Sequence, residues 1–553
     1  HGRLSWYNTT SSLNARPYFS TTKAQNIIND FGVSVGGPVI RNKTFYFGTF
    51  EGLRQRQSTI VTPSLPTLKM RQGDFSELLA RTPATIVRDP ITSQPYSNNQ
   101  VPSSLFSQAS VKWQNKFFPT PNYGPPELFV ANFRAAYPSG NRQDQFDVRV
   151  DHYFSPKNTL YARVSYRRNQ PLALDSGLPP DITGYRWQVR NGRLAAVSDT
   201  WTISPRLVNE FKAGFSRNLN PRGGMLTGQE IIDWLGIQGY PKQPADVRNI
   251  PVVSIQGFQQ VAQVAGETPA ENTFQYLDQM TYLRGRHTMK MGVELRPQQS
   301  NDIIYPQFGT YTFTNRFTGF AYSDFLIGLP QSTQRTLPRA GQYSRYWSMS
   351  MFVQDDFKVS RNLSLNYGLR YEYDKPAVDK YDTVFNFDLR SGSMVVPTDK
   401  ILKESINPAF PAQIPIITAQ QAGYPTRPLR NGDRNNFQPR VGFAWRPQAS
   451  GTTAIRGGYG VYMDDLTADI FSRQYGGPFR VTESFTNNIV SGAPVLTFTK
   501  PFLQLGTPGA VSIEALALNL RNPQIHQWNF TIDREFAFQT GLRISYVGCK
   551  STR

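Results

Sequence analysis

The chain has 553 residues, of which 13% are aromatic and only 18% are charged, and it contains 42 Gly and 41 Pro. Few charges with many aromatics and turn formers favour strands joined by loops. The single cysteine, Cys549, excludes an intrachain disulfide and a thiolate zinc site, and the four dispersed histidines show no metal-ligand spacing. No stretch approaches the roughly 20 apolar residues of a spanning helix, so a membrane protein of this sequence must be a barrel.

The chain is strongly basic, with 59 Lys and Arg against 39 Asp and Glu, a formal charge of +20. Nucleic-acid-binding proteins gather such charge into a patch or tail. Here the arginines are scattered, and Arg167-Arg168 is about the densest run. We therefore expect them to face water inside a lumen, or anionic lipid headgroups and lipopolysaccharide, with no nucleic-acid partner.

Residues 145–168 show the clearest strand pattern, with a break at Ser155-Pro156-Lys157-Asn158. The apolar positions are Phe146, Val148, Val150, Leu160, Ala162, Val164 and Tyr166, and the polar ones are Asp147, Arg149, Asp151, Arg163, Ser165 and Arg167. This is the two-residue repeat of a transmembrane hairpin with strands of about ten residues. A soluble sheet packed on a core by one face gives the same alternation, so one hairpin leaves both structures open.

Turns followed by alternating strands recur along the chain. The turns are Ile203-Ser-Pro-Arg206, Arg284-Gly-Arg286, Val359-Ser-Arg-Asn362, Pro447-Gln-Ala-Ser-Gly451 and Phe538-Gln-Thr-Gly541. The alternate connections are long, at about 61–140, 220–270, 375–433 and 464–520. Short turns at one end and long loops at the other are typical of an outer-membrane barrel. The sequence predicts an all-β fold, a large antiparallel transmembrane β-barrel with roughly 15 to 17 strands in this chain.

The alternation also assigns faces. Val164 and Leu365 are predicted to face lipid. The predicted lumen-facing residues are Asp147, Arg149, Asp151, Arg163, Arg167, Lys290, Glu294, Arg296, Arg370 and Glu372. Aromatic residues beside the short turns fit an interfacial girdle, although strand propensity explains them equally well. These are Tyr153, Phe154, Trp201, Phe357, Trp445 and Phe536.

Several phrases resemble a known family in family order across almost the whole chain. They are Phe31-Gly-Val-Ser-Val-Gly-Gly-Pro38, Lys43-Thr-Phe-Tyr-Phe-Gly-Thr-Phe-Glu-Gly-Leu-Arg54, Met70-Arg-Gln-Gly-Asp-Phe-Ser76, Arg88-Asp-Pro90, Phe118-Pro-Thr-Pro-Asn122, Thr318-Gly-Phe-Ala-Tyr-Ser-Asp-Phe-Leu-Ile-Gly-Leu-Pro330, Phe352-Val-Gln-Asp-Asp-Phe-Lys358, Leu365-Asn-Tyr-Gly-Leu-Arg-Tyr-Glu372, Asn436-Phe-Gln-Pro-Arg-Val-Gly-Phe443, Arg456-Gly-Gly-Tyr-Gly460, Asn522-Pro-Gln-Ile-His-Gln-Trp528 and Ser545-Tyr-Val-Gly548. Together they are similar to Oar-like TonB-dependent receptors, which carry a carboxypeptidase-regulatory-like domain and are frequent in Acidobacteria. Cys549 departs from the small hydroxyl residue that is more usual there.

The resemblance implies that residues 1–553 are an incomplete barrel domain, about 16 of roughly 22 strands. A signal peptide, a regulatory-like domain and a plug are expected before His1, and the final strands after Arg553. It also implies location in the outer membrane and proton-motive-force-driven uptake of a large or scarce solute, such as an oligosaccharide, a peptide or a metal chelate. The implied partners are membrane lipid and lipopolysaccharide, the chain's own plug, the TonB complex through the missing N-terminal region, and an unidentified extracellular ligand.

We expect no enzyme activity, catalytic residue, metal or cofactor. The string Gly32-Val-Ser-Val-Gly36 matches a nucleophile elbow, but strand-like residues follow it where a helix is required. Asp355-Asp356 and Asp464-Asp465 are adjacent pairs whose side chains point to opposite faces of a strand, so neither pair can flank one bond. Both pairs are expected to be solvated carboxylates near strand ends.

The long loops carry candidate ligand-stacking aromatics, namely Tyr96, Trp113, Tyr123, Tyr240 and Tyr424. Such residues could stack on sugar rings, but packing within their own loops is the better expectation, because aromatics bury large apolar areas. Two other functions stay open: an outer-membrane adhesin or binding barrel without active uptake, and a secreted all-β carbohydrate-binding protein.

Overall fold

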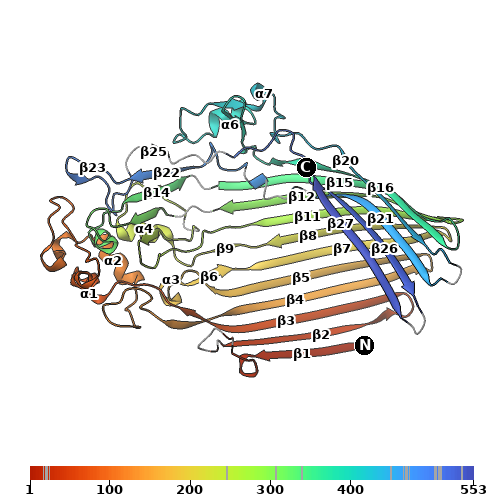
Figure 1. Ribbon diagram of the computed structural model, residues 1–553, viewed down its shortest axis with the longest axis horizontal. Coiled ribbons are helices and arrows are strands. Elements are labelled where there is room, and N and C mark those ends of the chain that lie inside the picture. The colour runs from red at the N-terminus through yellow and green to blue at the C-terminus, as the bar shows by residue number, and fades with distance from the viewer. Residues whose placement is uncertain are drawn as a thin grey trace.

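The computed structural model describes residues 1–16, 18, 23, 25–244, 247–304, 308–337, 340–448, 451–464, 466, 471–472, 474–502, 507–508, 514–536 and 540–552. Its main element is one curved antiparallel sheet of 17 strands (Figure 1). This number agrees with the 15 to 17 strands predicted from the alternation.

Fifteen strands form the wall of the sheet in the order in which they follow one another along the chain. They are β1 (Gly2–Thr10), β2 (Asn26–Ile40), β3 (Thr44–Val61), β4 (Ala135–Ser155), β5 (Asn158–Leu174), β7 (Arg190–Ser204), β8 (Leu207–Leu219), β11 (Ala270–Arg284), β12 (His287–Ile304), β15 (Ala340–Lys358), β16 (Leu363–Asp379), β20 (Asn436–Trp445), β21 (Thr453–Met463), β26 (Gln524–Glu535) and β27 (Gly541–Thr552). Two short strands, β6 (Tyr185–Gln188) and β9 (Arg222–Gly223), extend it beyond β5.

The wall has two chemically different faces. On β4 and β5, Val148 pairs with Val164, and Arg149 pairs with Arg163. Because the side-chain period of a strand is two, this register places the apolar residues on one face, here named the outer face, and the charged residues on the other, the inner face. Val164 is 52% exposed on the outer face. Leu365 also lies on the outer face, where it is half-buried opposite Phe357 and Phe443.

The two ends of the wall differ as predicted. Adjacent strands are joined at one end by short turns, at 41–43, 156–157, 205–206, 285–286, 359–362, 446–452 and 536–540. The last two predicted turns, Pro447–Gly451 and Phe538–Gly541, lie partly outside the described residues. The predicted long loops lie at the other end, together with three further connections at 11–25, 175–189 and 305–339. One expectation was wrong: β4 and β5 have 21 and 17 residues, not about ten each. Their polar halves continue the ladder past the apolar band and toward the loops.

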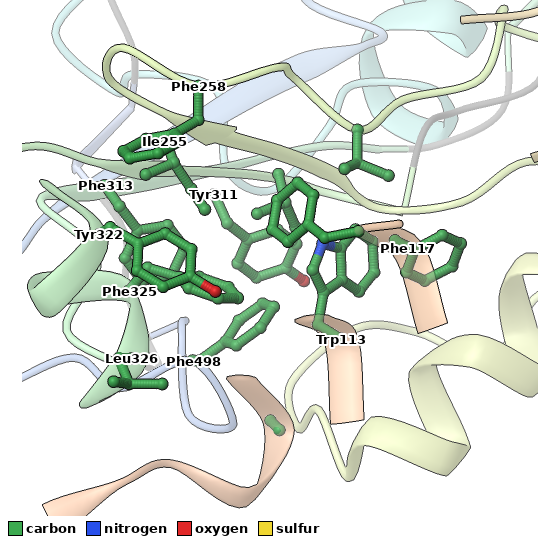
Figure 2. Close-up of a cluster of buried hydrophobic side chains, with 14 of the residues drawn as sticks. Trp113, Phe117, Ile255, Phe258, Tyr311, Phe313, Tyr322, Phe325, Leu326 and Phe498 are labelled. Atoms are coloured by element: carbon green, nitrogen blue, oxygen red, sulfur yellow. The ribbon is translucent and has the colours of Figure 1, made fainter. Parts of the chain in front are cut away.

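The long connections fold into a cap with its own hydrophobic core (left in Figure 1). Residues of 62–134, 220–269, 308–337 and 487–502 meet in this core. Trp113, Tyr311, Tyr322, Phe325 and Phe498 are fully buried there, and their rings pack at tilted or edge-on angles (Figure 2). An aromatic core of this size gives loops a defined shape that backbone pairing alone would not provide.

Short elements complete the cap and a smaller lobe at 380–435. The strands are β10 (Val252–Ile255), β13 (Thr310–Phe313), β14 (Ser332–Leu337), β22 (Val481–Thr486) and β25 (Thr507–Pro508) in one sheet, β17 (Asn386–Asp388), β18 (Ser393–Val396) and β19 (Ile416–Thr418) in a second, and β23 (Ile489–Val490) with β24 (Ala493–Pro494). The helices are α1 (Leu68–Arg71), α2 (Gln108–Phe117), α3 (Pro180–Thr183), α4 (Gly228–Leu235), α5 (Ala321–Leu326), α6 (Asp399–Glu404) and α7 (Ala419–Ala422), with 3-10 turns at Ser11–Leu13, Ser76–Ala80, Ser97–Asn99 and Ser103–Leu105. None of the helices in the described part of the chain is long and apolar enough to cross a membrane.

Asp324 is a buried carboxyl in the cap, and its titration makes cap stability depend on pH. It accepts hydrogen bonds from the backbone N–H groups of Phe317 (2.9 Å) and Thr318 (2.7 Å). Burial nevertheless raises the pKa of Asp324 to about 7, and burial also raises the pKa of Asp175 to about 6. Between about pH 4 and 7 the folded cap keeps protons that the unfolded chain releases, so the free energy of unfolding falls as pH rises.

We expect the cap to lose about 2–4 kcal/mol of stability between pH 4.5 and 7.5, measured by hydrogen exchange of β10 and β13. Asp324→Asn should flatten most of this slope, because an amide resembles the neutral carboxyl and does not titrate. Asp175 would supply part of the slope that remains. Stability that rises with pH over this range would contradict the buried, protonated state of Asp324.

Candidate functional site: the polar inner face

The inner face of the wall holds the ten charged residues that the alternation predicts to share one face. Residues that pair across neighbouring strands lie on the same face of the sheet. Arg163 on β5 pairs with Ala196 on β7, which pairs with Gly214 on β8, which pairs with Gln275 on β11. The register of β11 with β12 places Arg296 on that same face. From β12 it continues to Ser350 on β15 and Glu372 on β16. The ten residues therefore belong to one surface, although they fall into two groups, on β4 and β5 and on β12 and β16, with β7, β8 and β11 between β5 and β12.

The first group lies on β4 and β5. Arg163 Nη2 is 2.6 Å from Asp147 Oδ1, and Ser165 donates a hydrogen bond to the same carboxylate. Arg149 Nη2 is 2.6 Å from Asp151 Oδ1, while Arg167 donates to Gln143 Oε1 at 2.6 Å. Pairs of this kind contribute little stability while they stay hydrated, but they hold long side chains in fixed positions along the wall.

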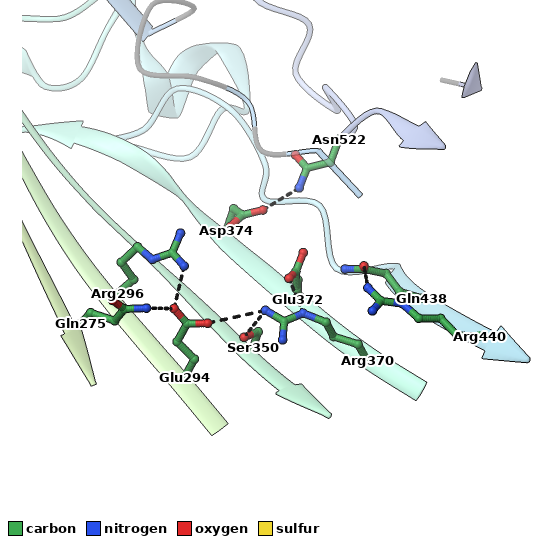
Figure 3. Close-up of polar contacts among 10 residues, drawn as sticks. All are labelled: Gln275, Glu294, Arg296, Ser350, Arg370, Glu372, Asp374, Gln438, Arg440 and Asn522. Carbon is green, nitrogen blue, oxygen red and sulfur yellow. Dashed lines mark hydrogen bonds and ion pairs between the residues drawn. The ribbon is translucent and has the colours of Figure 1, made fainter. Parts of the chain in front are cut away.

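The second group forms a network on β11, β12, β15 and β16 (Figure 3). Glu294 Oε1 accepts hydrogen bonds from Arg296 Nη2 and Gln275 Nε2, each at 2.6 Å. Arg370 Nη2 lies 3.7 Å from Glu294 Oε2, although β15 separates their strands. Arg370 Nε is also 2.5 Å from Glu372 Oε1. Side chains from strands two apart thus converge on this face.

Beside this network lies a hollow of about 470 Å³ on β15, β16, β20, β21 and β26. The polar residues that line it combine carboxamides with two arginines, two aspartates and three tyrosines. These are Gln354, Asn366, Gln438, Gln527 and Asn529, then Arg370 and Arg440, Asp355 and Asp356, and Tyr367, Tyr459 and Tyr462. The sequence predicted Arg370 on this face but not the carboxamides, because uncharged amides do not stand out in an alternating strand. The signal present in the sequence is Gln438 and Arg440 alternating with Phe437, Pro439 and Val441.

Lys290 is the one predicted lumen-facing residue not yet placed in either group. It lies on β12, is exposed, and has no hydrogen bond or ion pair within the described chain.

The five loop aromatics do not form one site. Trp113 is 0% exposed in the cap core and offers no surface to a ligand. Tyr96 and Tyr240 pack against the same core, and Tyr424 packs in the smaller lobe. Tyr123 is 51% exposed, with the guanidinium of Arg134 5.7 Å from its ring centroid.

Two sequence strings that resemble catalytic motifs lie in ordinary strands. Ser34 pairs with Arg3 of β1 and Thr49 of β3, and another strand follows β2. Asp355 and Asp356 point to opposite faces of β15, as predicted, and Asp465 lies outside the described residues. Among the described residues, no group of three or more His, Cys, Asp and Glu side chains could hold a metal ion.

The expectation that Asp355 is solvated was wrong, since this residue is only 7% exposed. On the outer face, its Oδ2 lies 2.6 Å from His287 Nδ1 and accepts a hydrogen bond from Tyr367 Oη at 2.7 Å. The His287 ring stacks on Phe357, with ring centroids 4.2 Å apart. Asp355 thereby joins three strands near the short turns. Its burial depends on residues of the other two strands, so the sequence around Asp355 does not indicate it.

Comparison with known proteins agrees with this architecture. The family model described as "Outer membrane beta barrel domain" matches residues 1–553. Among solved structures, the outer membrane transporter YddB from Escherichia coli aligns with 99% of this chain at 11% identity and a TM-score of 0.51. The siderophore receptor PirA from Acinetobacter baumannii aligns with all of it at 9% identity and a TM-score of 0.45. A search of curated proteins found no match.

The chain spans about half the length of these structures, 51% of YddB and 52% of PirA. At such low identity the likeness to YddB concerns the fold alone. The family match covers every residue, and it agrees with the apolar outer face, the polar inner face and the separation of short turns from long loops. The chain therefore belongs to the outer membrane β-barrel domain family and is a protein of the outer membrane.

Proposed function

We propose that residues 1–553 form the wall of an Oar-like, TonB-dependent receptor that takes up a large or scarce solute with proton-motive force. The observation that carries the proposal is the combination of a continuous polar inner face with a cap built from the long loops. A cap with its own buried core can hold a binding surface at the extracellular end. An inner wall lined by Arg, Glu and carboxamides keeps the bore hydrated for a polar solute or a plug.

Two alternatives were open from the sequence. A secreted carbohydrate-binding protein does not fit the outer-membrane family or the apolar outer face. An adhesin or binding barrel without uptake has the same wall and would differ only in lacking a plug and a TonB-contacting segment. The proposal therefore depends on those two parts.

The coding sequence on either side of this chain is the first test. We expect a signal peptide, a regulatory-like domain and a plug upstream, and several more alternating strands downstream. An open reading frame that contains the wall and no plug would remove active uptake and favour the adhesin. Where the plug is present, uptake should stop when a protonophore collapses the proton-motive force, while surface binding continues.

A further inference from the structure

The short turns at one end of the wall (right in Figure 1) carry a band of exposed cations. We propose that the corner formed by two of these turns, 285–286 and 359–362, binds the phosphate of an anionic phospholipid headgroup in the surrounding leaflet. The corner lies on the outer side of the wall, so lipid binding there is independent of solute uptake. A lipid bound at this place would help to hold the barrel at a fixed height in its membrane.

The charges of the short turns all have one sign. Six of the seven short turns contain Lys or Arg, and none of the seven contains Asp or Glu. On the inner face, by contrast, Arg149 and Arg163 are paired with carboxylates at 2.6 Å. The turn cations are exposed and form no ion pair with any described residue; they are Arg41, Lys43, Lys157, Arg206, Arg286, Arg361 and Arg446. A band of unpaired cations favours an anionic surface outside the chain at the level of the turns.

Aromatic side chains fix that level relative to the membrane. Trp445 directly precedes the turn at 446–452, pairs with Leu363 on the outer face and is exposed. Trp201 is likewise exposed on the outer face of β7, close to the turn at 205–206. Indole rings sit at the headgroup level of a bilayer, and the short turns of an outer-membrane barrel lie on the periplasmic side. The turn cations therefore lie beside the phosphates of the periplasmic leaflet.

One cation at this end projects from the outer face itself. Arg284 pairs with His287, which pairs with Phe357, which pairs with Leu365 of the outer face. Residues paired in this way share a face, so Arg284 lies on the lipid side of the sheet, where it is exposed. Its strand, β11, is flanked by β8 and β12, and a plug would fill the bore on the opposite side of the sheet. A plug therefore leaves Arg284 uncovered.

Backbone bonds hold the two turns of the corner together. Arg286 Nη1 donates a hydrogen bond to the carbonyl oxygen of Val359 at 2.7 Å. The backbone N–H of Lys358 donates to the carbonyl oxygen of Arg286 at 2.9 Å. The turn that carries Arg286 is thus fixed against the turn that carries Arg361, which brings the cations of both turns to one place.

The carboxylates near the corner do not cancel its charge. Asp355 lies on the outer face, where its Oδ2 is 2.6 Å from His287 Nδ1. Asp356 points to the inner face, away from the lipid. Three guanidinium groups therefore outweigh one carboxylate on the outer side, whether or not His287 is protonated. They belong to Arg284, Arg286 and Arg361.

The chemistry of the corner selects an anionic phospholipid. A guanidinium group binds a phosphate through two parallel hydrogen bonds and is always charged in a protein. Phosphatidylglycerol offers such a phosphate and carries no cation. Phosphatidylethanolamine carries an ammonium group beside its phosphate, and the arginines repel that group. The corner should therefore prefer phosphatidylglycerol when the acyl chains of the two lipids are the same.

Native mass spectrometry of the intact, detergent-solubilised protein tests the site. The protein is equilibrated with dioleoyl phosphatidylglycerol or dioleoyl phosphatidylethanolamine, and the bound fraction gives an apparent Kd for each lipid. We expect phosphatidylglycerol to bind more tightly. Arg284→Gln and Arg361→Gln should each weaken its binding roughly five-fold and leave the binding of phosphatidylethanolamine unchanged. Both arginines are exposed, so the variants should fold.

Lys290→Gln and Lys358→Gln are the matched controls. Both lysines are exposed cations at the same end of the wall, but the register places them on the inner face, opposite Gln354 and Ser364. Each control should change the Kd for phosphatidylglycerol by less than about two-fold, because the sheet and the solvent separate these lysines from the headgroup.

Three results would overturn the site. Equal losses in the outer-face variants and the controls would mean diffuse attraction to a basic protein. Equal affinity for the two lipids, or displacement of phosphatidylglycerol by millimolar inorganic phosphate, would mean that no headgroup is selected. Phosphatidylglycerol binding that is unchanged in Arg284→Gln and Arg361→Gln would leave these arginines to an acidic periplasmic protein. None of the measurements requires TonB or proton-motive force, so the site and the proposed uptake are tested separately.

Discussion

Val164→Arg is expected to destabilise the folded barrel in lipid by about 2–4 kcal/mol, because it places a cation in the apolar band near mid-bilayer. Val164 is exposed on the outer face and pairs with Val148, and the turn at 156–157 lies about seven residues away along β5. The free energy of unfolding in phospholipid vesicles, followed by denaturant titration, measures this loss directly.

Ser165→Arg is the matched control, one residue along the same strand. Ser165 lies on the inner face and donates a hydrogen bond to Asp147, so a new guanidinium would meet a carboxylate and water rather than lipid. We expect a change within about 0.5 kcal/mol. If both arginines proved equally harmless, the assignment of the two faces would be wrong.

The wall could be predicted because its information is local. Alternation with period two, a Pro or Gly turn and a second alternating run define a hairpin without reference to the rest of the chain. The strand β1 is not among the predicted strands: only Leu4 and Trp6 mark its outer face, too short a run to separate from a loop. Face assignments on β5 and β12 follow from the same period.

The cap and the hollow depend instead on contacts between segments far apart in sequence. Trp113 and Phe498 meet in one core although they are 385 positions apart in the chain, with ring centroids separated by 6.2 Å, and no local pattern pairs them. Gln438 is buried because β15, β16, β21 and β26 curve around it, whereas its sequence position suggests only a strand residue. The burial of Asp355 likewise requires His287 and Tyr367 from two other strands.

Trp113→Ala is expected to cost the cap about 3–5 kcal/mol, the range for removing a fully buried aromatic side chain. The Trp113 ring packs 4.3 Å from that of Phe117, centroid to centroid, and its indole N–H has no hydrogen-bond partner within the described chain. The loss therefore comes from packing and from the cavity left behind. Hydrogen exchange should accelerate in β10, β13 and β14 but not in β4, β5 or β12, because the wall is held by its own ladder.

Tyr123→Ala separates packing from ligand contact among the loop aromatics. Tyr123 is exposed, so its truncation should change cap stability by no more than about 0.5 kcal/mol. If a ligand stacks on the cap at Tyr123, Tyr123→Ala lowers the affinity for that ligand and leaves hydrogen exchange unchanged. Trp113→Ala instead changes both the affinity and the hydrogen exchange, because it disrupts the packing of the cap. Unchanged exchange in Trp113→Ala would instead mean that the cap core contributes little to the shape of the loops, and a binding surface on the cap would then have to be ordered by the ligand itself.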